Sequence, residues 1–491
     1  MNHINRIVKK YFPHALLIAL TFVIVGCAGW RQERTAAPIA DMPERFINAP
    51  PAGEYLDGEW WKLFNDPVLD QLIDTAFDSN LTILAAAARL DQYQALANAS
   101  QASWFPTLTF GLTASESGPI GDPAPAPGVL LNPTAPSYKP SLTAVYELDL
   151  WGKLKAGRSA AYADLLANRE DLRAVVLATT TTIARVYYTI IELQQQAELL
   201  DRTVATYSAN LNIITGRYNL GVSSAVDLYQ AEANLAGARM QRSTVEQNLA
   251  TVEHSLSVLL GRYPQRGTIG KGTEFPLKAE VHINSIPGEL IQQRPDVQAS
   301  YQRLKATDNR VAEATARFFP TITLTGVIGG SGNELATAFD PDNMLWNLIG
   351  GLTAPVFQGG RIKAGYDQAE AVWRGQLAQH KAVTLKAFQE VEDAIVRSNL
   401  QVDIVQALTD QVTASHSALQ MSTDRYLQGV TDYLPVVVGQ ASYLNAERSL
   451  ITAKRQLVES RIGLAGTVGG SWLDRSAERA IKAGRSEGNN Q

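Results

Sequence analysis

Mostly apolar residues recur every seven positions along two consecutive stretches of the chain. In the first stretch one row begins at Leu165 and a companion row begins at Val176. In the second stretch a row of leucines begins at Leu228 and is interrupted at Arg242. A sustained seven-residue repeat is typical of helices that supercoil around one another, as in an ordinary antiparallel coiled coil. It predicts two long helices, over 152–216 and 223–261.

A second pattern, alternation of apolar and polar residues, is found ahead of these helices. Leucines, phenylalanine and alanine alternate with threonines and serine over 106–115, and the alternation returns over 141–151. These segments predict a β-hairpin over 106–151. Their length of about ten residues fits a tilted transmembrane strand. Alternation alone is more often typical of a half-buried soluble sheet.

The whole arrangement occurs twice. Three landmarks return in the same order, the first offset by 214 residues and the other two by 208. They are Trp104-Phe105-Pro106-Thr107 with Phe318-Phe319-Pro320-Thr321, Gly152-Lys153 with Gly360-Arg361, and Arg217-Tyr218 with Arg425-Tyr426. We therefore expect two internal repeats, over 64–262 and 290–470, with a linker at 263–289 and a polar C-terminal tail at 471–491. The change of offset predicts six extra residues in the first repeat, within a Pro-rich loop at 118–140.

The second repeat is less regular than the first. It predicts a β-hairpin over 320–357 and long helices over 360–428 and 432–468. Gly350-Gly351 weakens its strand pattern, and His380 and Gln401 occupy the apolar row of its first long helix.

The first thirty residues resemble an export signal. Basic residues precede an apolar run over 15–25, which is too short for a membrane-spanning helix of about 20 residues. Ile24-Val25-Gly26-Cys27 resembles the bacterial lipobox. That resemblance implies a signal peptide at 1–26, a diacylglycerol and an N-acyl chain on Cys27, and a lipid-anchored segment at 27–63. Ala28 after the cysteine points to the outer membrane. An uncleaved signal with a chance cysteine is the alternative.

Composition excludes several classes of protein. The 491 residues carry 43 Lys+Arg against 48 Asp+Glu, a net charge of -5, so no basic excess suggests a nucleic-acid partner. One cysteine excludes an intramolecular disulfide and an iron–sulfur cluster. No nucleophile elbow, phosphate loop or metal-ligand cluster is visible, so we expect neither an enzyme nor a cofactor.

Four strands cannot close a barrel by themselves. Lipid forbids open sheet edges, because unpaired backbone groups cost several kcal/mol each in hydrocarbon. If the strands span a membrane, several copies of the chain must share one barrel.

Several motifs resemble one family. The run from Trp60 to Asp70 is similar to the opening motif of the TolC-like outer-membrane efflux proteins, and Gln293-Arg294-Pro295-Asp296 is similar to the motif that opens their second repeat. With the lipobox, the chain resembles the lipoprotein subgroup that serves resistance-nodulation-division pumps. The resemblance implies a mixed α and β membrane protein. In it, three chains form a twelve-stranded outer-membrane β-barrel, continued by a long periplasmic α-helical barrel.

The resemblance also implies a function. It predicts the passive outer channel of a tripartite efflux system, a homotrimer joined by a periplasmic adaptor to an inner-membrane pump. Alternatives are an exit duct for secreted protein or metal ions, and a periplasmic coiled-coil scaffold. The 5 Met and 6 His give no support for a soft-metal path.

Candidate gate residues follow from the family pattern. The long helices turn back at 219–227 and 427–435, and the resemblance implies that Leu434, with Val226 as its counterpart, narrows the pore there. Family members often carry an aspartate one turn further on, where this chain has Val438 and Gln230. Asp432 and Asp227 are the nearest acidic candidates, as gate, cap or surface charges.

Other site residues are expected nearby and in the barrel. Tyr218 and Tyr426 could hold neighbouring helices together or simply pack. Ser223 or Ser224, and Thr431 or Asp432, are expected N-caps of the returning helices. Glu147 and Asp149 are expected to face the barrel lumen, where charge is tolerated.

Overall fold

The computed structural model describes residues 46–47, 58–118, 135–267, 269–270, 274–279, 293–470 and 472–488. The expected signal peptide and Cys27 lie outside the described residues. So do parts of the 27–63 segment, of the loop at 118–140 and of the linker at 263–289.

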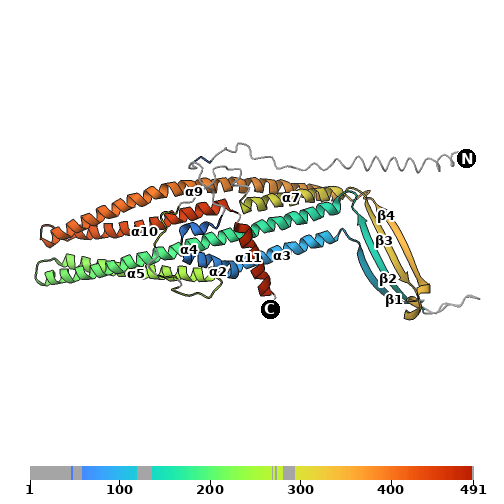
Figure 1. The fold of residues 1–491 in the computed structure, drawn as a ribbon, viewed down its shortest axis with the longest axis horizontal. Coiled ribbons are helices and arrows are strands. Elements are labelled where there is room, and N and C mark those ends of the chain that lie inside the picture. Colours follow the sequence, from blue (N-terminus) through green and yellow to red (C-terminus); the bar gives the residue numbers. More distant parts are fainter. Residues whose placement is uncertain are drawn as a thin grey trace, which may run out of the picture. The chain divides into compact units, whose positions relative to one another are not determined.

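Helices and strands follow the duplicated plan (Figure 1). The first repeat contains η1 (Trp60–Phe64), α2 (Pro67–Ser79), α3 (Leu81–Ala102), β1 (Thr107–Ser117), β2 (Ala135–Leu148), α4 (Lys153–Asn219) and α5 (Ala225–Leu259). The second contains α7 (Pro295–Ala316), β3 (Thr321–Gly330), α8 (Leu335–Ala338), η2 (Pro341–Asn343), β4 (Met344–Thr353), α9 (Arg361–Leu427) and α10 (Leu434–Val468). Helix α11 (Trp472–Gly488) follows.

Element bounds reproduce the two offsets found in the sequence. Helix α7 begins and ends 214 residues after α3, and α9 begins and ends 208 residues after α4. The turns that follow α4 and α9 contain Gly221 and Gly429, whose φ angles are +75° and +73°. Because only glycine adopts this left-handed conformation without strain, the same helix ending is encoded at both places.

Two predicted segments differ from the structure. Strand β2 begins at Ala135, inside the expected loop, because Ala135–Pro140 pairs with Leu112–Ser117 of β1 despite its two prolines. The expected polar tail is a helix over the described residues 472–488, because Trp472, Leu473, Ala477 and Ala480 form a buried apolar stripe within its polar sequence.

The chain forms two compact units, and the strands lie in the first, which comprises the described parts of 93–166 and 302–379. They form one antiparallel sheet in the order β1-β2-β3-β4. The β2–β3 pairing joins the two repeats. Within the described chain, β1 and β4 each have one edge without a partner strand.

The sheet has one apolar and one predominantly polar face, because paired residues point to the same side. The pairing places on the apolar face Leu108, Phe110 and Leu112 of β1, Leu142, Tyr146 and Leu148 of β2, Ile322, Leu324 and Ile328 of β3, and Trp346, Leu348 and Leu352 of β4. The other face carries eight threonines, Glu147 and Asn347, interspersed with Val145, Val327, Leu345 and Ile349. Most of the large apolar side chains on the sheet are exposed in the single chain.

The second unit contains the main hydrophobic core. The predicted rows of α4 are buried there, including Leu172, Ile183 and Leu200. Leu172 and Ile183 pack in one cluster with the aromatic residues Trp60, Trp61 and Phe64 of η1 and with Trp472 of α11. Leu200 belongs to a second cluster, with Leu193 and Val245. An apolar stretch of α4 is long enough to cross a membrane, yet most of it is buried in the protein, as expected of a core helix.

Candidate functional site

The two helical turns contact each other within the second unit. The hydroxyl of Tyr426, at the end of α9, lies 3.1 Å from Oγ of Ser223, in the turn between α4 and α5. The Arg217 guanidinium lies over the Tyr426 ring, 5.1 Å from its centroid. Tyr433, which belongs to the second repeat as Tyr426 does, has its ring centroid 5.2 Å from that of Tyr426. Tyr426 therefore links the turns of the two repeats.

A small apolar cluster supports this contact. It consists of Ile214, Ala231, Tyr426, Tyr433 and Val436. Burial raises the pKa of Tyr433 to about 12, so its hydroxyl stays neutral at physiological pH. The turns are thus fixed to each other by packing, by the Arg217–Tyr426 stacking contact and by one hydroxyl pair. Among the described residues, no ion pair joins Asp227 or Asp432 to the other turn.

The expected constriction residues occupy a different environment. Leu434 and Val226 stand in the first turns of α10 and α5, where their side chains are 66% and 75% exposed. Val438 is also exposed. It lies on the same helix face as Leu434 because it follows Leu434 by four residues. Asp432 is exposed beside them. A single chain leaves this apolar face uncovered, and its role as a constriction stays a prediction.

Tyr218 does not repeat the environment of Tyr426. It is 41% exposed, whereas Tyr426 is 7% exposed, although the two are 208 residues apart and occupy equivalent positions.

The returning helices begin differently. Ser224 is the N-cap of α5: its Oγ accepts a hydrogen bond from the Asp227 amide at 3.2 Å, and an Asp227 carboxylate oxygen accepts one from the Ser224 amide at 3.1 Å. Asp227 is therefore engaged in a capping box. For α10 the expected caps Thr431 and Asp432 are wrong. The N-cap is Tyr433, which makes no side-chain cap bond and is held by its buried ring instead.

Arg217 and Ser223 were not predicted as partners of Tyr426. The dipeptide Arg217-Tyr218, repeated as Arg425-Tyr426, was visible in the sequence. Periodicity could not reveal that the arginine of one repeat stacks on the tyrosine of the other.

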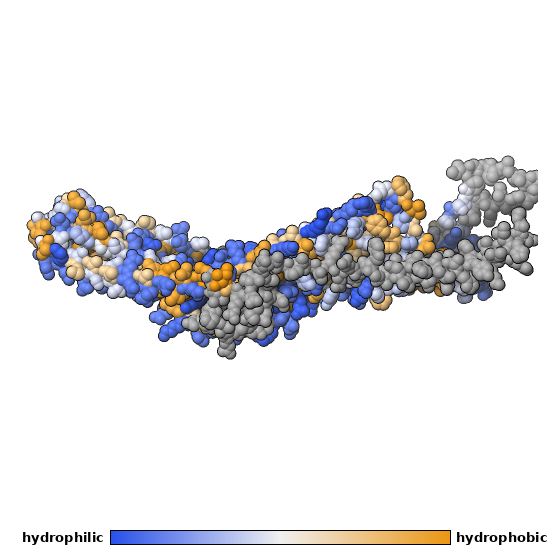
Figure 2. Space-filling model, turned by 90° about the horizontal axis from the view of Figure 1, so that it is seen from above, coloured by the Kyte–Doolittle hydropathy of each residue, from blue (hydrophilic) through white to orange (hydrophobic). Residues whose placement is uncertain are grey.

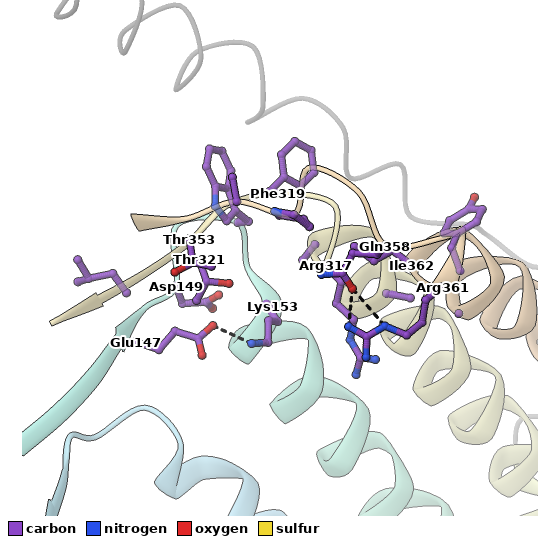
Figure 3. Close-up of a pocket in the computed structure, with 18 residues that line it drawn as sticks. Glu147, Asp149, Lys153, Arg317, Phe319, Thr321, Thr353, Gln358, Arg361 and Ile362 are labelled. Carbon is purple, nitrogen blue, oxygen red and sulfur yellow. Dashed lines mark hydrogen bonds and ion pairs between the residues drawn. The ribbon is translucent and has the colours of Figure 1, made fainter. Parts of the chain in front are cut away.

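The ends of the strands form a second polar site, in the first unit (Figure 3). Glu147 pairs with Lys153, whose Nζ lies 2.8 Å from Oε1. The Asp149 carboxylate accepts hydrogen bonds from the amides of Leu154 and Lys155 at 3.0 and 2.8 Å, and so caps the start of α4. Both acids line a cavity of about 360 Å³ that also includes Arg317. Glu147 belongs to the polar face of the sheet. That Glu147 and Asp149 face a barrel lumen stays a prediction.

Comparison with known proteins identifies the family. The sequence profile described as Outer membrane efflux protein matches residues 72–262 and 286–470. The chain belongs to this family. The double match agrees with the two repeats seen in the sequence and in the element bounds.

Individual relatives match most of the chain. It is 28% identical to the toluene efflux pump outer membrane protein TtgF of Pseudomonas putida, covering 95% of this chain and 98% of the relative. It is 27% identical to the probable outer membrane lipoprotein SilC of Salmonella typhimurium, covering 94% and 99%. The open-state structure of the Neisseria gonorrhoeae MtrE outer membrane channel matches with a TM-score of 0.78 at 25% identity, covering 88% and 96%.

This outer membrane efflux protein thus has the TolC-like fold, with four strands per chain, long helices and two repeats. It is the outer-membrane channel component of an efflux pump, extends into the periplasm and is not an enzyme. Its family excludes the coiled-coil scaffold considered from the sequence.

Proposed function

We propose that three copies of this chain form a passive conduit that carries drugs or other small molecules across the outer membrane. The sheet carries this proposal: its two free edges and one apolar face are what a barrel segment requires. Three copies of a four-stranded sheet supply twelve strands, with the apolar face toward lipid and the threonine-rich face toward a water-filled lumen.

The periplasmic end is closed by side chains at the helical turns. Leu434 of each copy, with Val226 from the first repeat, narrows the pore, because both project from the first turn of a returning helix and neither is covered by its own chain. Since Val438 lies one turn beyond Leu434, the constriction is apolar over two levels and excludes water and ions by dewetting.

The turns also receive the other components of the pump. Leu220, Val222 and Val430 are exposed at the turns, and Figure 2 shows apolar surface gathered where the helical hairpins turn back. A periplasmic adaptor docks on these turns and connects the channel to an inner-membrane resistance-nodulation-division transporter, which supplies the energy.

The mature chain is held in the membrane twice, by the barrel and by acyl chains on Cys27. The lipobox-like sequence supports the second anchor. Mass spectrometry of the mature N-terminus tests it directly.

The gate is tested by conductance. Replacing Leu434 with Ala widens the constriction, so the single-channel conductance of trimers in planar bilayers should rise. Val258→Ala is the matched control. Val258 is 61% exposed, close to the 66% of Leu434, but it stands near the C-terminal end of α5, away from the helical turns. Unchanged conductance in well-folded Leu434→Ala trimers would show that Leu434 does not limit the pore.

A further inference from the structure

The connection between β3 and β4 is a folded segment, 331–343, which contains α8 and η2. It lies at the end of the sheet opposite to the strand ends that lead into the long helices. Because those helices extend into the periplasm, this segment lies at the external end of the barrel.

Two glycines determine on which side of the sheet the segment folds. Gly330 is the last residue of β3, and Gly332 continues its register by exchanging hydrogen bonds with Tyr138 of 2.8 and 3.1 Å. Both therefore fall on the apolar face, together with Ile328 and Trp346. A Cβ at Gly330 would lie 2.1 Å from the Ala338 carbonyl oxygen, and one at Gly332 would lie 2.4 Å from Oγ1 of Thr337.

The segment thus packs against the apolar face and leaves the polar face open. Ala338, within the segment, is fully buried where the segment meets this face. The segment is internally braced, because the Asn343 side-chain amide donates to the Thr337 carbonyl at 2.8 Å and Asp340 caps η2.

Its outer surface combines two kinds of side chain. Leu335 and Phe339 are 48% and 43% exposed. Three carboxylates, on Glu334, Asp340 and Asp342, are exposed on the same short segment. This combination is typical of a structure at a membrane interface, where apolar groups enter the hydrocarbon and charged groups remain in the headgroup layer.

We propose that residues 331–343 form an interfacial foot in the outer leaflet of the outer membrane. In this foot Leu335 and Phe339 enter the edge of the hydrocarbon layer, and the three carboxylates stay among the lipid headgroups. The foot is continuous with the apolar face of the sheet, which meets lipid in the assembled barrel. It fixes the height of the β3–β4 hairpin in the membrane.

Another copy of the chain is the competing occupant of this surface, and the topology argues against it. The segment rests on the inner pair β2 and β3, through Tyr138 and Gly332. Neighbouring copies must instead pair with the free edges of β1 and β4.

Site-directed spin labelling tests the foot in full-length trimers reconstituted in liposomes that contain lipopolysaccharide. Phe339→Cys carries the nitroxide, and its collision rates with oxygen, which enters lipid, and with a water-soluble nickel chelate are compared. Lys139→Cys is the matched control. Lys139 lies at the end of β2 that contacts the segment, but its side chain is on the polar face of the sheet. Trp346→Cys reports whether the apolar face itself meets lipid. The unsubstituted chain measures any labelling of Cys27.

We expect the oxygen-to-nickel collision ratio at 339 to be several-fold higher than at 139 and to approach the ratio at 346. A ratio at 339 equal to that at 139 would place the segment in water and overturn the foot. Exclusion of both reagents at 339 would show that protein covers the segment, which also overturns it. A low ratio at 346 would instead contradict the orientation of the barrel, so failure of the foot and failure of the proposed assembly are distinguished.

Discussion

At the scale of residues, the two equivalent tyrosines show what sequence could and could not predict. The repeat of Arg217-Tyr218 as Arg425-Tyr426 identified both tyrosines as gate candidates. Only Tyr426 is buried, because the first repeat of the same chain supplies Arg217 and Ser223 to it. The chain leaves Tyr218 41% exposed, and the repeat of the dipeptide could not predict that the two tyrosines differ in burial.

The Tyr426 hydroxyl is expected to hold the two turns together. Tyr426→Phe removes the 3.1 Å contact with Ser223 and should lower the local stability by about 1 kcal/mol. The rate of amide hydrogen exchange over 219–224 should therefore rise about fivefold. Ser223→Ala should have the same effect. Because both changes remove one bond, the double variant should be no worse than either single variant. Additive effects would show that the two hydroxyls act separately.

At the scale of elements, helix and strand positions were predictable because their periods are long and sustained, whereas their starts depend on single side chains. The pattern placed α5 and α10 within a few residues. It suggested a serine cap for α5 and a threonine or aspartate cap for α10, and only α5 has a side-chain cap. The polar composition after Gly470 likewise hid α11, whose few apolar residues are spaced along one helix face and complete the core around Trp61.

The difference between the two starts gives a paired prediction. Ser224→Ala removes the N-cap of α5 and should destabilise its first turn by about 0.5–2 kcal/mol. Asp432→Ala, at the corresponding place before α10, should have little effect, because Asp432 makes no cap bond. Hydrogen exchange of the first turns of α5 and α10 measures both. Equal destabilisation by the two changes would contradict the assigned caps.

His380 explains a break in the apolar row of α9 and predicts a pH dependence. Its Nδ1 lies 2.7 Å from Oγ of Ser300 on α7, and its ring lies beside Tyr301. Burial lowers the pKa of His380, so the folded state favours the neutral ring. This contribution to stability is complete above the unfolded pKa of about 6.5 and is lost as the pH falls through the lower folded value.

Thermal unfolding between pH 7.5 and pH 5 tests that sign. The native protein should lose more stability on acidification than His380→Gln, which keeps a polar side chain but cannot take up a proton in this range. If both proteins lost the same stability, the acid sensitivity would have to come from other groups.

At the scale of the whole molecule, duplication and strand number followed from the sequence because each repeat carries its own landmarks. Four strands per chain were predictable. The need for further copies stays a prediction, which the two free edges of the sheet support. The faces of the sheet became certain only with the register, since a slip of one residue would exchange the apolar and polar sides. In the proposed assembly, neighbouring copies cover the free surfaces of one chain. The internal repeat predicts which residues of two copies meet.

The contact between the repeats within a chain should recur between chains. A residue of the first repeat corresponds here to the residue 208 positions later, so Ser223 corresponds to Thr431, and Tyr218 to Tyr426. The Ser223–Tyr426 contact therefore predicts that Thr431 lies beside Tyr218 of the partner subunit, with Arg425 stacked on that ring. This would bury the tyrosine that a single chain leaves exposed.

Chemical cross-linking distinguishes the two contacts. In a chain carrying Tyr218→Cys and Thr431→Cys, a short bismaleimide should produce covalent dimers and trimers, and no larger species, on denaturing gels. The matched pair Ser223→Cys and Tyr426→Cys should react within each chain and leave it monomeric, because those residues already meet there. Since three copies close the ring, species larger than trimers would contradict the assembly. Monomers alone from the first pair would contradict the equivalence of the two interfaces, even if the channel were trimeric.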